Sequence, residues 1–392
     1  MAKWFEKRLD EIAEFNPRET LKKGSIAKKI SMDKLQPFCR DVPGFELEPY
    51  SGGTKFRNGD TIMARITPCL ENGKTAKVSV LENGEVGFGS TEYIVFRAKD
   101  GCDSDFLYYL VTSSIVRGPA IKSMVGSSGR QRVQTDVLQT LMVKVPDLET
   151  QQSISGILKS LDDKIAANRK INDNLEQQAQ ALYQELFITN TDPSWETGTI
   201  SNLGTVIGGS TPSKARPEYY TKNGIAWITP KDLSINKSKF ITHGESDITE
   251  LGLKNSSATV MPEGTVLFSS RAPIGYIAIA AGNITTNQGF KSVVPNAEIG
   301  TAYVYYYLKQ NLSMIERLAS GSTFKEVSRG TMKSVPAIVP DSKAIQEFNN
   351  FCLPIFEQQK VLETQNRTLA GLRDSLLPKL MSGELDVSAV EL

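Results

Sequence analysis

Residues 151–187, QQSISGILKSLDDKIAANRKINDNLEQQAQALYQELF, decide what kind of fold this chain adopts. Mostly apolar side chains recur in the stretch at alternating spacings of three and four, at Ile154, Leu158, Leu161, Ile165, Asn168, Asn172, Leu175, Ala179, Leu182 and Leu186. This periodicity is typical of the buried face of a coiled-coil helix. The stretch has one glycine, Gly156, and no proline. It therefore predicts one unbroken helix, about 55 Å long at about 1.5 Å per residue.

The same pattern returns 194 residues later, at Cys352, Ile355, Gln359, Leu362, Asn366, Leu369, Arg373, Leu376 and Leu380. Neither helix can bury its apolar stripe alone, so we expect the two to pair with each other, antiparallel. The residues expected to make this pairing are Leu161, Ile165, Asn168, Asn172, Leu175, Leu182, Ile355, Leu362, Asn366, Leu369 and Leu376. The asparagines are expected to set the register of the pair, since a polar seam position trades stability for alignment. Partly exposed positions on a loose helix would look the same in sequence.

The rest of the chain also contains an internal repeat, at an offset near 195–205 residues. Trp4, Leu9 and Ile12 have the spacing of Trp195, Ile200 and Leu203. Four further pairs of segments follow in the same order: 59–65 with 264–271, 106–110 with 303–308, 126–132 with 321–325, and 143–146 with 337–340. Such an ordered series indicates a duplication.

The predicted fold class is α+β, with two mixed α/β domains and two long helices. We expect a first domain at 1–147, a helical region at 148–190, a second domain at 191–341 and a second helical region at 342–392. Strands are expected at 61–66, 76–81, 93–96, 265–269, 276–280 and 292–294, and helices near 104–117 and 301–318.

Composition excludes several classes of protein. The formal net charge is +1, which argues against a protein that coats DNA without sequence preference. The four cysteines form no C-x-x-C pair, so neither a zinc knuckle nor a disulfide framework is expected. A single histidine, His243, cannot build a His-rich metal site, and we expect it at the surface. With no run of 18 apolar residues and a charged N-terminal stretch, the chain is expected in the cytoplasm, without a membrane contact.

Polar loops in both domains carry the residue types that contact DNA: Arg and Lys for guanine and phosphate, Asn and Gln for adenine, Ser and Thr for phosphate. In the first domain the candidate DNA contacts are Lys28, Lys29, Lys55, Arg57, Arg65, Lys74, Thr75, Lys77, Ser90, Thr91, Arg130, Gln131 and Arg132. In the second they are Ser210, Thr211, Ser213, Lys214, Arg216, Thr229, Lys231, Ser270, Arg271, Thr286, Asn287, Gln288, Ser322, Thr323 and Lys325. Inert surface turns have a similar composition, so these loops alone do not establish DNA binding.

The assembled pattern resembles the specificity subunits of type I restriction-modification systems over essentially the whole chain. The stretches that carry the resemblance are Gly209-Ser210-Thr211-Pro212, Tyr219-Tyr220, residues 224–233 (GIAWITPKDL), Thr286-Asn287-Gln288-Gly289, residues 321–324 (GSTF) and residues 376–385 (LLPKLMSGEL). The first domain lacks the GSTP and WITP stretches and looks like another recognition-domain type of that family.

The resemblance implies two target-recognition domains, each reading half of a split, non-palindromic double-stranded DNA target, with the helices as spacer and docking surface. It also implies two methyltransferase subunits and two restriction subunits as partners. The chain itself is expected to bind no metal and no cofactor and to catalyse no reaction. Two other hypotheses stay open at this point: a tandem scaffold whose helices bind protein and whose domains never touch DNA, and an enzyme with an unrecognised site.

Overall fold

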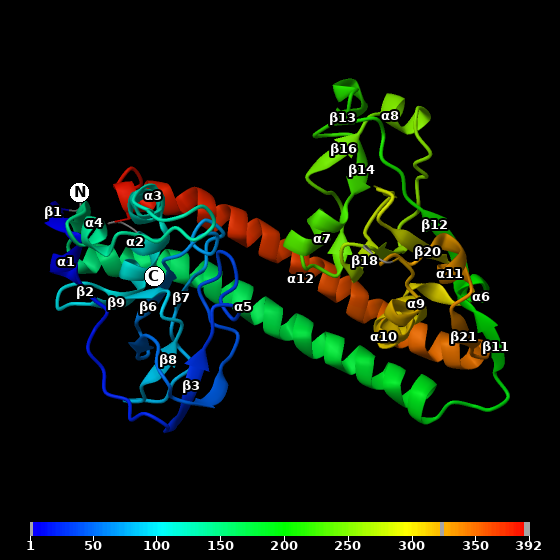
Figure 1. Cartoon of the computed structure of the whole chain (residues 1–392), viewed down its shortest axis with the longest axis horizontal. Helices are drawn as coiled ribbons and strands as arrows, with labels where there is room; N and C mark the ends of the chain where they lie inside the picture. The colour runs from blue at the N-terminus through cyan, green and yellow to red at the C-terminus, as the bar shows by residue number, and fades with distance from the viewer. Residues whose placement is uncertain (1–2, 322–324, 388–392) are drawn as a thin grey trace. The chain divides into compact units, whose positions relative to one another are not determined.

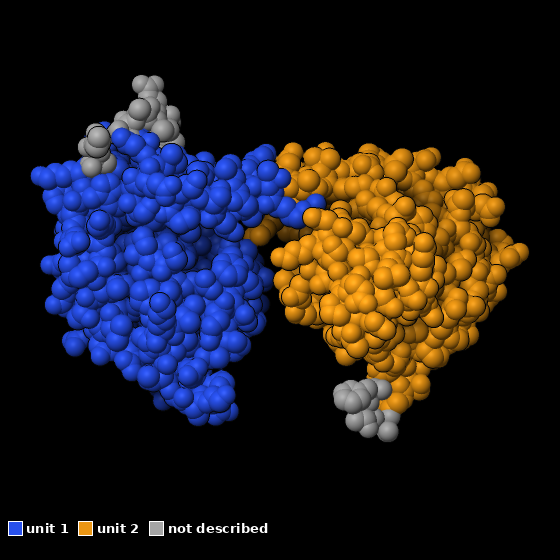
Figure 2. Space-filling model, turned by 90° about the horizontal axis from the view of Figure 1, so that it is seen from above, with its two compact units in different colours: residues 1–167, 366–392 blue, residues 168–365 orange. Residues whose placement is uncertain are grey.

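The computed structural model describes residues 3–321 and 325–387. It divides into two compact units, residues 1–167 with 366–392 and residues 168–365 (Figure 2). Each unit contains one globular domain and part of each of the two long helices, α5 (Leu148–Gln184) and α12 (Ser342–Ser382) (Figure 1). A single π-helical turn, η1 (Glu185–Thr189), follows α5.

The first globular domain is built from two small sheets and a separate strand pair. One sheet has the order β2 (Ala13–Phe15), β9 (Tyr93–Ala98), β6 (Thr61–Ala64), β7 (Thr75–Lys77). The other has the order β4 (Glu46–Pro49), β3 (Ile26–Ile30), β8 (Gly87–Gly89), β5 (Lys55–Phe56). The strand pair is β1 (Trp4–Arg8) with β10 (Met142–Pro146), and the helices are α1 (Leu9–Ile12), α2 (Ser104–Thr112), α3 (Ser114–Lys122) and α4 (Thr135–Gln139).

The second globular domain has a larger version of the same plan. Its main sheet has the order β12 (Gly204–Gly208), β20 (Lys291–Pro295), β17 (Val266–Ser270), β18 (Ile274–Ala280), β15 (Phe240–Ile241). A second sheet has the order β13 (Tyr220–Thr221), β16 (Ser246–Ile248), β14 (Ile225–Ile228), β19 (Thr285–Thr286), and β11 (Glu196–Thr199) pairs with β21 (Pro336–Val339). The helices are α6 (Ile200–Leu203), α7 (Pro230–Ile235), α8 (Glu250–Lys254), α9 (Gly300–Gln310), α10 (Leu312–Arg317) and α11 (Arg329–Lys333), with a 3₁₀ turn, η2, at Pro217–Tyr219.

The strand orders confirm the duplication. The series β2-β9-β6-β7 in the first domain matches β12-β20-β17-β18 in the second, and β1–β10 matches β11–β21. The short helices α1 and α6 follow the matching strands β1 and β11, and each buries the two apolar residues noted in the sequence. Leu9 and Ile12 are 0% and 3% exposed, and Ile200 and Leu203 are 1% and 0% exposed.

Some predicted elements end differently because loops compete for their backbone groups. The strand expected at 76–81 ends at Lys77, since Val78 hydrogen-bonds to the turn at Gly59 and Asp60 and the Leu81 N–H donates to Asn58. The helix expected near 104–117 is two helices, because Ser113 is extended and caps α3 by accepting from the Ile115 N–H. A similar break at Asn311 separates α9 from α10.

The two long helices pack against each other antiparallel, as expected. In the first unit, Ile154 and Leu158 near the start of α5 share a core with Leu380 and Met381 near the end of α12. In the second unit, Ala179 and Tyr183 near the end of α5 share a core with residues near the start of α12, such as Phe348.

Polar groups also bond across this seam. The Asn168 side-chain amide donates to Gln365 Oε1 at 3.3 Å, and the Gln359 amide donates to the Asn172 backbone carbonyl at 3.2 Å. Each of the eleven positions expected to pair is buried or half-buried. Among residues 3–321 and 325–387, no helix is both long and apolar enough to cross a membrane.

Candidate nucleic-acid interface

The same three chain segments meet at the end of an interior strand in each domain. After β6, the Arg65 N–H donates to the Glu92 carbonyl at 2.9 Å, and the Val133 N–H donates to the Arg65 carbonyl at 2.8 Å. At the end of β17, the Ser270 N–H donates to the Gly289 carbonyl at 2.7 Å, and the Val327 N–H donates to the Ser270 carbonyl at 3.0 Å. The backbone therefore brings three predicted loops together in each domain.

In the second domain two of these loops, at 271–272 and 287–289, border a hollow of about 780 Å³. It is lined by candidate residues from four stretches of that domain, namely Thr211, Lys214, Thr229, Lys231, Arg271, Asn287 and Gln288. Trp227, which is 7% exposed, forms part of the wall: its Nε1 donates to the Ser210 carbonyl at 2.9 Å, and its ring meets Tyr220 edge-on at 5.7 Å. Large aromatic groups thus set the shape of the hollow, and polar loop residues line it.

The rim near Thr229 is held by Asp232, which lies in the first turn of α7. Its carboxylate accepts from the Thr229 N–H at 2.7 Å, the Thr229 hydroxyl at 2.6 Å and the Glu245 N–H at 2.7 Å. This is a capping box, in which side chains satisfy backbone N–H groups that the helix leaves open. It also ties the loop containing Glu245 to the loop containing Thr229.

In the first domain the corresponding loops are joined by an ion pair. Arg132, at 47% side-chain exposure, binds Glu92 through Nε at 2.9 Å and Nη2 at 2.7 Å. This contact lowers the pKa of Glu92. Arg65 is half-buried beside it, and its Nε has no hydrogen-bond partner among the described residues.

Many of the predicted basic contacts are already paired with acidic groups. The pairs are Lys28 with Glu85, Lys29 with Glu48, Arg57 with Glu19, Lys77 with Asp105, Arg216 with Glu218, Lys231 with Glu245 and Arg271 with Glu326. Lys55 and Lys74 donate to the backbone carbonyls of Glu19 and Met32. Within the described part of the chain, Arg130, Lys214 and Lys325 are exposed and form no ion pair. Most cations must therefore exchange partners to bind a phosphate.

Three predicted contacts have buried side chains. Thr75, Ser270 and Thr286 are 2%, 0% and 1% exposed because they lie within strands β7, β17 and β19. Ser270 Oγ instead donates to the Gly289 carbonyl at 3.1 Å. We do not retain these three as DNA contacts. Ser322 and Thr323 lie outside the described residues. Ser90, Gln131 and Ser210 are half-buried, whereas Thr91 and Ser213 are exposed.

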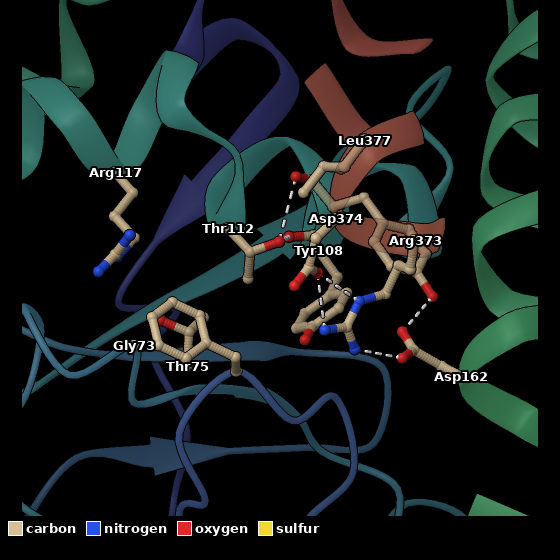
Figure 3. A pocket seen from close by; sticks show the side chains of 11 residues that line it. Gly73, Thr75, Tyr108, Thr112, Arg117, Asp162, Arg373, Asp374 and Leu377 are labelled. Atoms are coloured by element: carbon tan, nitrogen blue, oxygen red, sulfur yellow. Dashed lines mark hydrogen bonds and ion pairs between the residues drawn. The ribbon is translucent and has the colours of Figure 1, made fainter. Parts of the chain in front are cut away.

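Sequence reasoning missed a buried polar cluster in each unit that joins the globular domain to both long helices. In the first unit, Tyr109 Oη donates to Asp162 Oδ2 at 2.7 Å, and Arg373 Nη1 lies 2.6 Å from Asp162 Oδ1. Figure 3 shows Arg373 of α12 pointing toward Asp162 of α5, beside Tyr108 and Leu377. Tyr109 belongs to α2, so three elements meet at one carboxylate.

The second unit has a corresponding cluster at Glu176 of α5. Tyr306 of α9 donates to its carboxylate at 3.0 Å, and Lys309 and Lys239 both form ion pairs with it. Lys239 also donates to Gln359 of α12 at 2.7 Å. Burial acts to raise the pKa of Glu176, but the two ammonium groups outweigh it and lower this pKa to about 2.

A sequence signal for these clusters existed. The matching tyrosine pairs 108–109 and 305–306 lie in equivalent helices, and Gln359 and Arg373, like Asn366, are polar positions in a mainly apolar seam. A buried tyrosine hydroxyl needs a hydrogen-bond partner. The sequence does not show which partner each tyrosine uses, because each tyrosine lies 53 or more positions along the chain from the carboxylate that it binds.

No cluster of three or more His, Cys, Asp or Glu that could hold a metal ion occurs in residues 3–321 and 325–387. His243 has a side chain that is 60% exposed and lies 3.1 Å from Asp247. None of the four cysteines, all of which lie in the described ranges, forms a disulfide bond.

Comparison with known proteins adds independent information. A family model described as the type I restriction modification DNA specificity domain matches residues 1–177 and 193–367. The chain is 39% identical over 167 residues to the specificity subunit of the type I restriction enzyme MjaIX from Methanocaldococcus jannaschii. This matched stretch covers 42% of this chain and 38% of that protein. It is 25% identical over 424 residues to the HindI specificity subunit from Haemophilus influenzae, which covers 88% and 89%.

A solved structure supports the same fold. The S subunit of the type I restriction-modification system from M. genitalium has a TM-score of 0.59 and 14% sequence identity, and the match covers 97% of this chain and 96% of that one. At this identity the likeness concerns the fold alone.

Proposed function

This chain belongs to the type I restriction-modification DNA specificity family, a family of DNA-recognition subunits without catalytic activity, and we propose that each of its two globular domains reads one half of a split DNA target. The two halves differ in sequence, so the target is asymmetric. We further propose that the domains are 1–147 and 191–341 and that 148–190 and 342–392 are the helical regions.

The observation that carries this proposal is the repeated meeting point of three loops. The backbone bonds around Arg65 and Ser270 are the same, so both domains offer their loops in the same arrangement. The side chains on that shared frame differ: Arg132 pairs with Glu92 in the first domain, whereas the equivalent Glu326 of the second domain pairs with Arg271 and Lys291. Since base edges are distinguished by hydrogen-bond donors and acceptors, a common frame with different side chains reads different sequences.

The ion pairs explain how a nearly neutral chain can bind DNA selectively. The exposed Arg130, Lys214 and Lys325 are open to phosphates, whereas Arg132 and Lys231 must first leave Glu92 and Glu245. Exchanging an acidic side chain for a phosphate gains little on arbitrary DNA. It becomes favourable where the matching bases add their own contacts.

We propose that the antiparallel helices act as spacer between the half-sites and as docking surface for the other subunits of the system. By the family resemblance these are two methyltransferase and two restriction subunits, acting in the cytoplasm. The helix pairing supports the spacer role, because α5 and α12 each extend into both units.

Fluorescence anisotropy with labelled DNA tests the function directly. For the chain with its methyltransferase partner, the logarithm of affinity should fall linearly with the logarithm of salt concentration, because bound phosphates release counterions. Lys214→Ala should weaken binding to all sequences and lower the slope by about one. Lys222→Ala, an exposed lysine of the same unit outside the hollow, is the matched control.

The remaining alternative, a scaffold that never touches DNA, predicts the opposite result. Binding that is absent even with the partner present, or that does not change with salt, would support the scaffold and refute DNA recognition.

A further inference from the structure

Two neighbouring amides, Asn287 and Gln288, line the hollow of the second domain with their acceptor atoms already engaged. Asn287 Oδ1 accepts from the Gly289 N–H at 2.9 Å. Gln288 Oε1 accepts from the Thr211 hydroxyl. The Asn287 backbone N–H donates to the Ile228 carbonyl at 2.9 Å, which fixes the turn that presents both side chains.

The donor atoms of the same amides are open. Among the described residues, neither Asn287 Nδ2 nor Gln288 Nε2 has a hydrogen-bond partner, and both residues line the hollow. Lys214 beside them is exposed and also lacks a partner within the described chain. The Asn287 orientation follows from the backbone, since only its oxygen can accept from an N–H.

Nearby acceptors are occupied as well. Asp232 accepts three hydrogen bonds from Thr229 and the Glu245 N–H, and the Glu245 carboxylate binds Lys231 at 2.6 Å. The amide nitrogens and Lys214 are therefore the donors of this lining that have no partner among the described residues.

Base recognition depends on this distinction. Reading adenine in the major groove with Asn or Gln needs both atoms of the amide: the oxygen accepts from N6 and the nitrogen donates to N7. Guanine offers two acceptors, O6 and N7, and needs only donors. By residue type, Asn287 and Gln288 were expected to read adenine, but each amide oxygen already accepts one hydrogen bond from the protein, whereas each amide nitrogen has no partner among the described residues.

We propose that Asn287 and Gln288 act on DNA as hydrogen-bond donors, through the two amide nitrogens, and that the base edge they recognise is that of guanine. This inference rests on the proposed function, that the second domain reads DNA. It does not extend to the first domain, where the corresponding loop carries the hydroxyls Ser90 and Thr91 instead of amides.

The test is selection of binding sites from random DNA by the full chain with its methyltransferase partner. Asn287→Asp keeps an oxygen to accept from the Gly289 N–H but replaces the open donor by an acceptor. Affinity for the wild-type site should fall about 10- to 100-fold, the discrimination of a good base contact. One guanine in the selected half-site should become cytosine, whose N4 amino group donates.

A second variant restores the acceptor rather than removing the donor. Thr211→Val deletes the hydroxyl that engages Gln288 Oε1, so that one guanine position should come to tolerate adenine. Asn283→Asp is the matched control: it makes the same charge change on an exposed asparagine of this unit outside the hollow, and should leave the selected sequence unchanged.

The outcomes separate the two levels of the argument. If the wild-type half-site has an A·T pair at the position whose preference Asn287→Asp changes, the guanine assignment is overturned while DNA recognition stands. An unchanged preference in both Asn287→Asp and Thr211→Val, with melting temperatures equal to wild type, overturns it too. Absence of DNA binding by the wild-type complex overturns the proposed function and this inference with it.

Discussion

Replacing Lys239 by methionine should destabilise the second unit strongly, although the residue does not line the hollow proposed to read DNA. Its side chain is 7% exposed, and its ammonium binds Glu176 of α5 and Gln359 of α12. It also lies 4.3 Å from the ring centre of Phe356 and 4.8 Å from that of Tyr305. Methionine fills the space of the lysine stem but leaves the Glu176 carboxylate without its most buried cation.

The size of the effect follows from what remains around Glu176. Breaking a buried ion pair by removing one partner costs about 3–5 kcal/mol, because the other charge stays buried. Lys309 still lies 2.6 Å from the Glu176 carboxylate and offsets part of this loss. We therefore expect a loss of about 2–3 kcal/mol in the free energy of unfolding. For a unit of this size that lowers the melting temperature by about 4–12 °C.

Thermal unfolding followed by circular dichroism and tryptophan fluorescence measures this change, and Trp195 and Trp227 both report on the second unit. The matched control is Lys360→Met on α12, whose partner Glu263 is 59% exposed, so the loss should stay below about 1 kcal/mol. Equal shifts for Lys239→Met and Lys360→Met would refute the reasoning that the Lys239 cluster stabilises the contact between domain and helices.

Three further predictions follow from the clusters and the helices. Because the folded-state pKa of Glu176 is about 2, below its usual 4.5, its contribution to stability is present above pH 4.5 and is lost as pH falls toward 2; the difference in unfolding free energy between wild type and Glu176→Gln should therefore shrink over that range, and a constant difference would contradict this. Arg373→Leu should lower the unfolding free energy by about 3 kcal/mol in urea denaturation because Asp162 stays buried, whereas Asp374→Asn, at 62% exposure, should have a much smaller effect. Deleting one heptad from residues 151–187 should change the gap tolerated between half-sites and leave their sequences unchanged, as measured by selection on DNA with varied gaps; an unchanged gap would contradict the spacer role.

The sequence by itself determined the features that depend on local periodicity. The seam from Ile154 to Leu186 can be predicted from the sequence, because a helix repeats its buried face every three to four residues, whatever surrounds it. The duplication can be predicted for a similar reason. Leu9 with Ile12 and Ile200 with Leu203 are the buried residues of one-turn helices, and helix geometry sets the three-residue spacing within each pair. The family resemblance predicted the same two domains and two helices.

Only the tertiary structure decided which polar groups are open to a ligand. Thr75, Ser270 and Thr286 have the composition of binding residues, yet strand pairing buries them. Gln288 looks like an adenine reader until Thr211, 77 positions earlier in the chain, engages its oxygen. Lys239 donates a hydrogen bond to Gln359, which lies 120 positions later in the chain. Hydrogen bonds and ion pairs of this kind depend on distances between segments that local sequence does not encode, and they decide which atoms of a predicted loop can meet DNA.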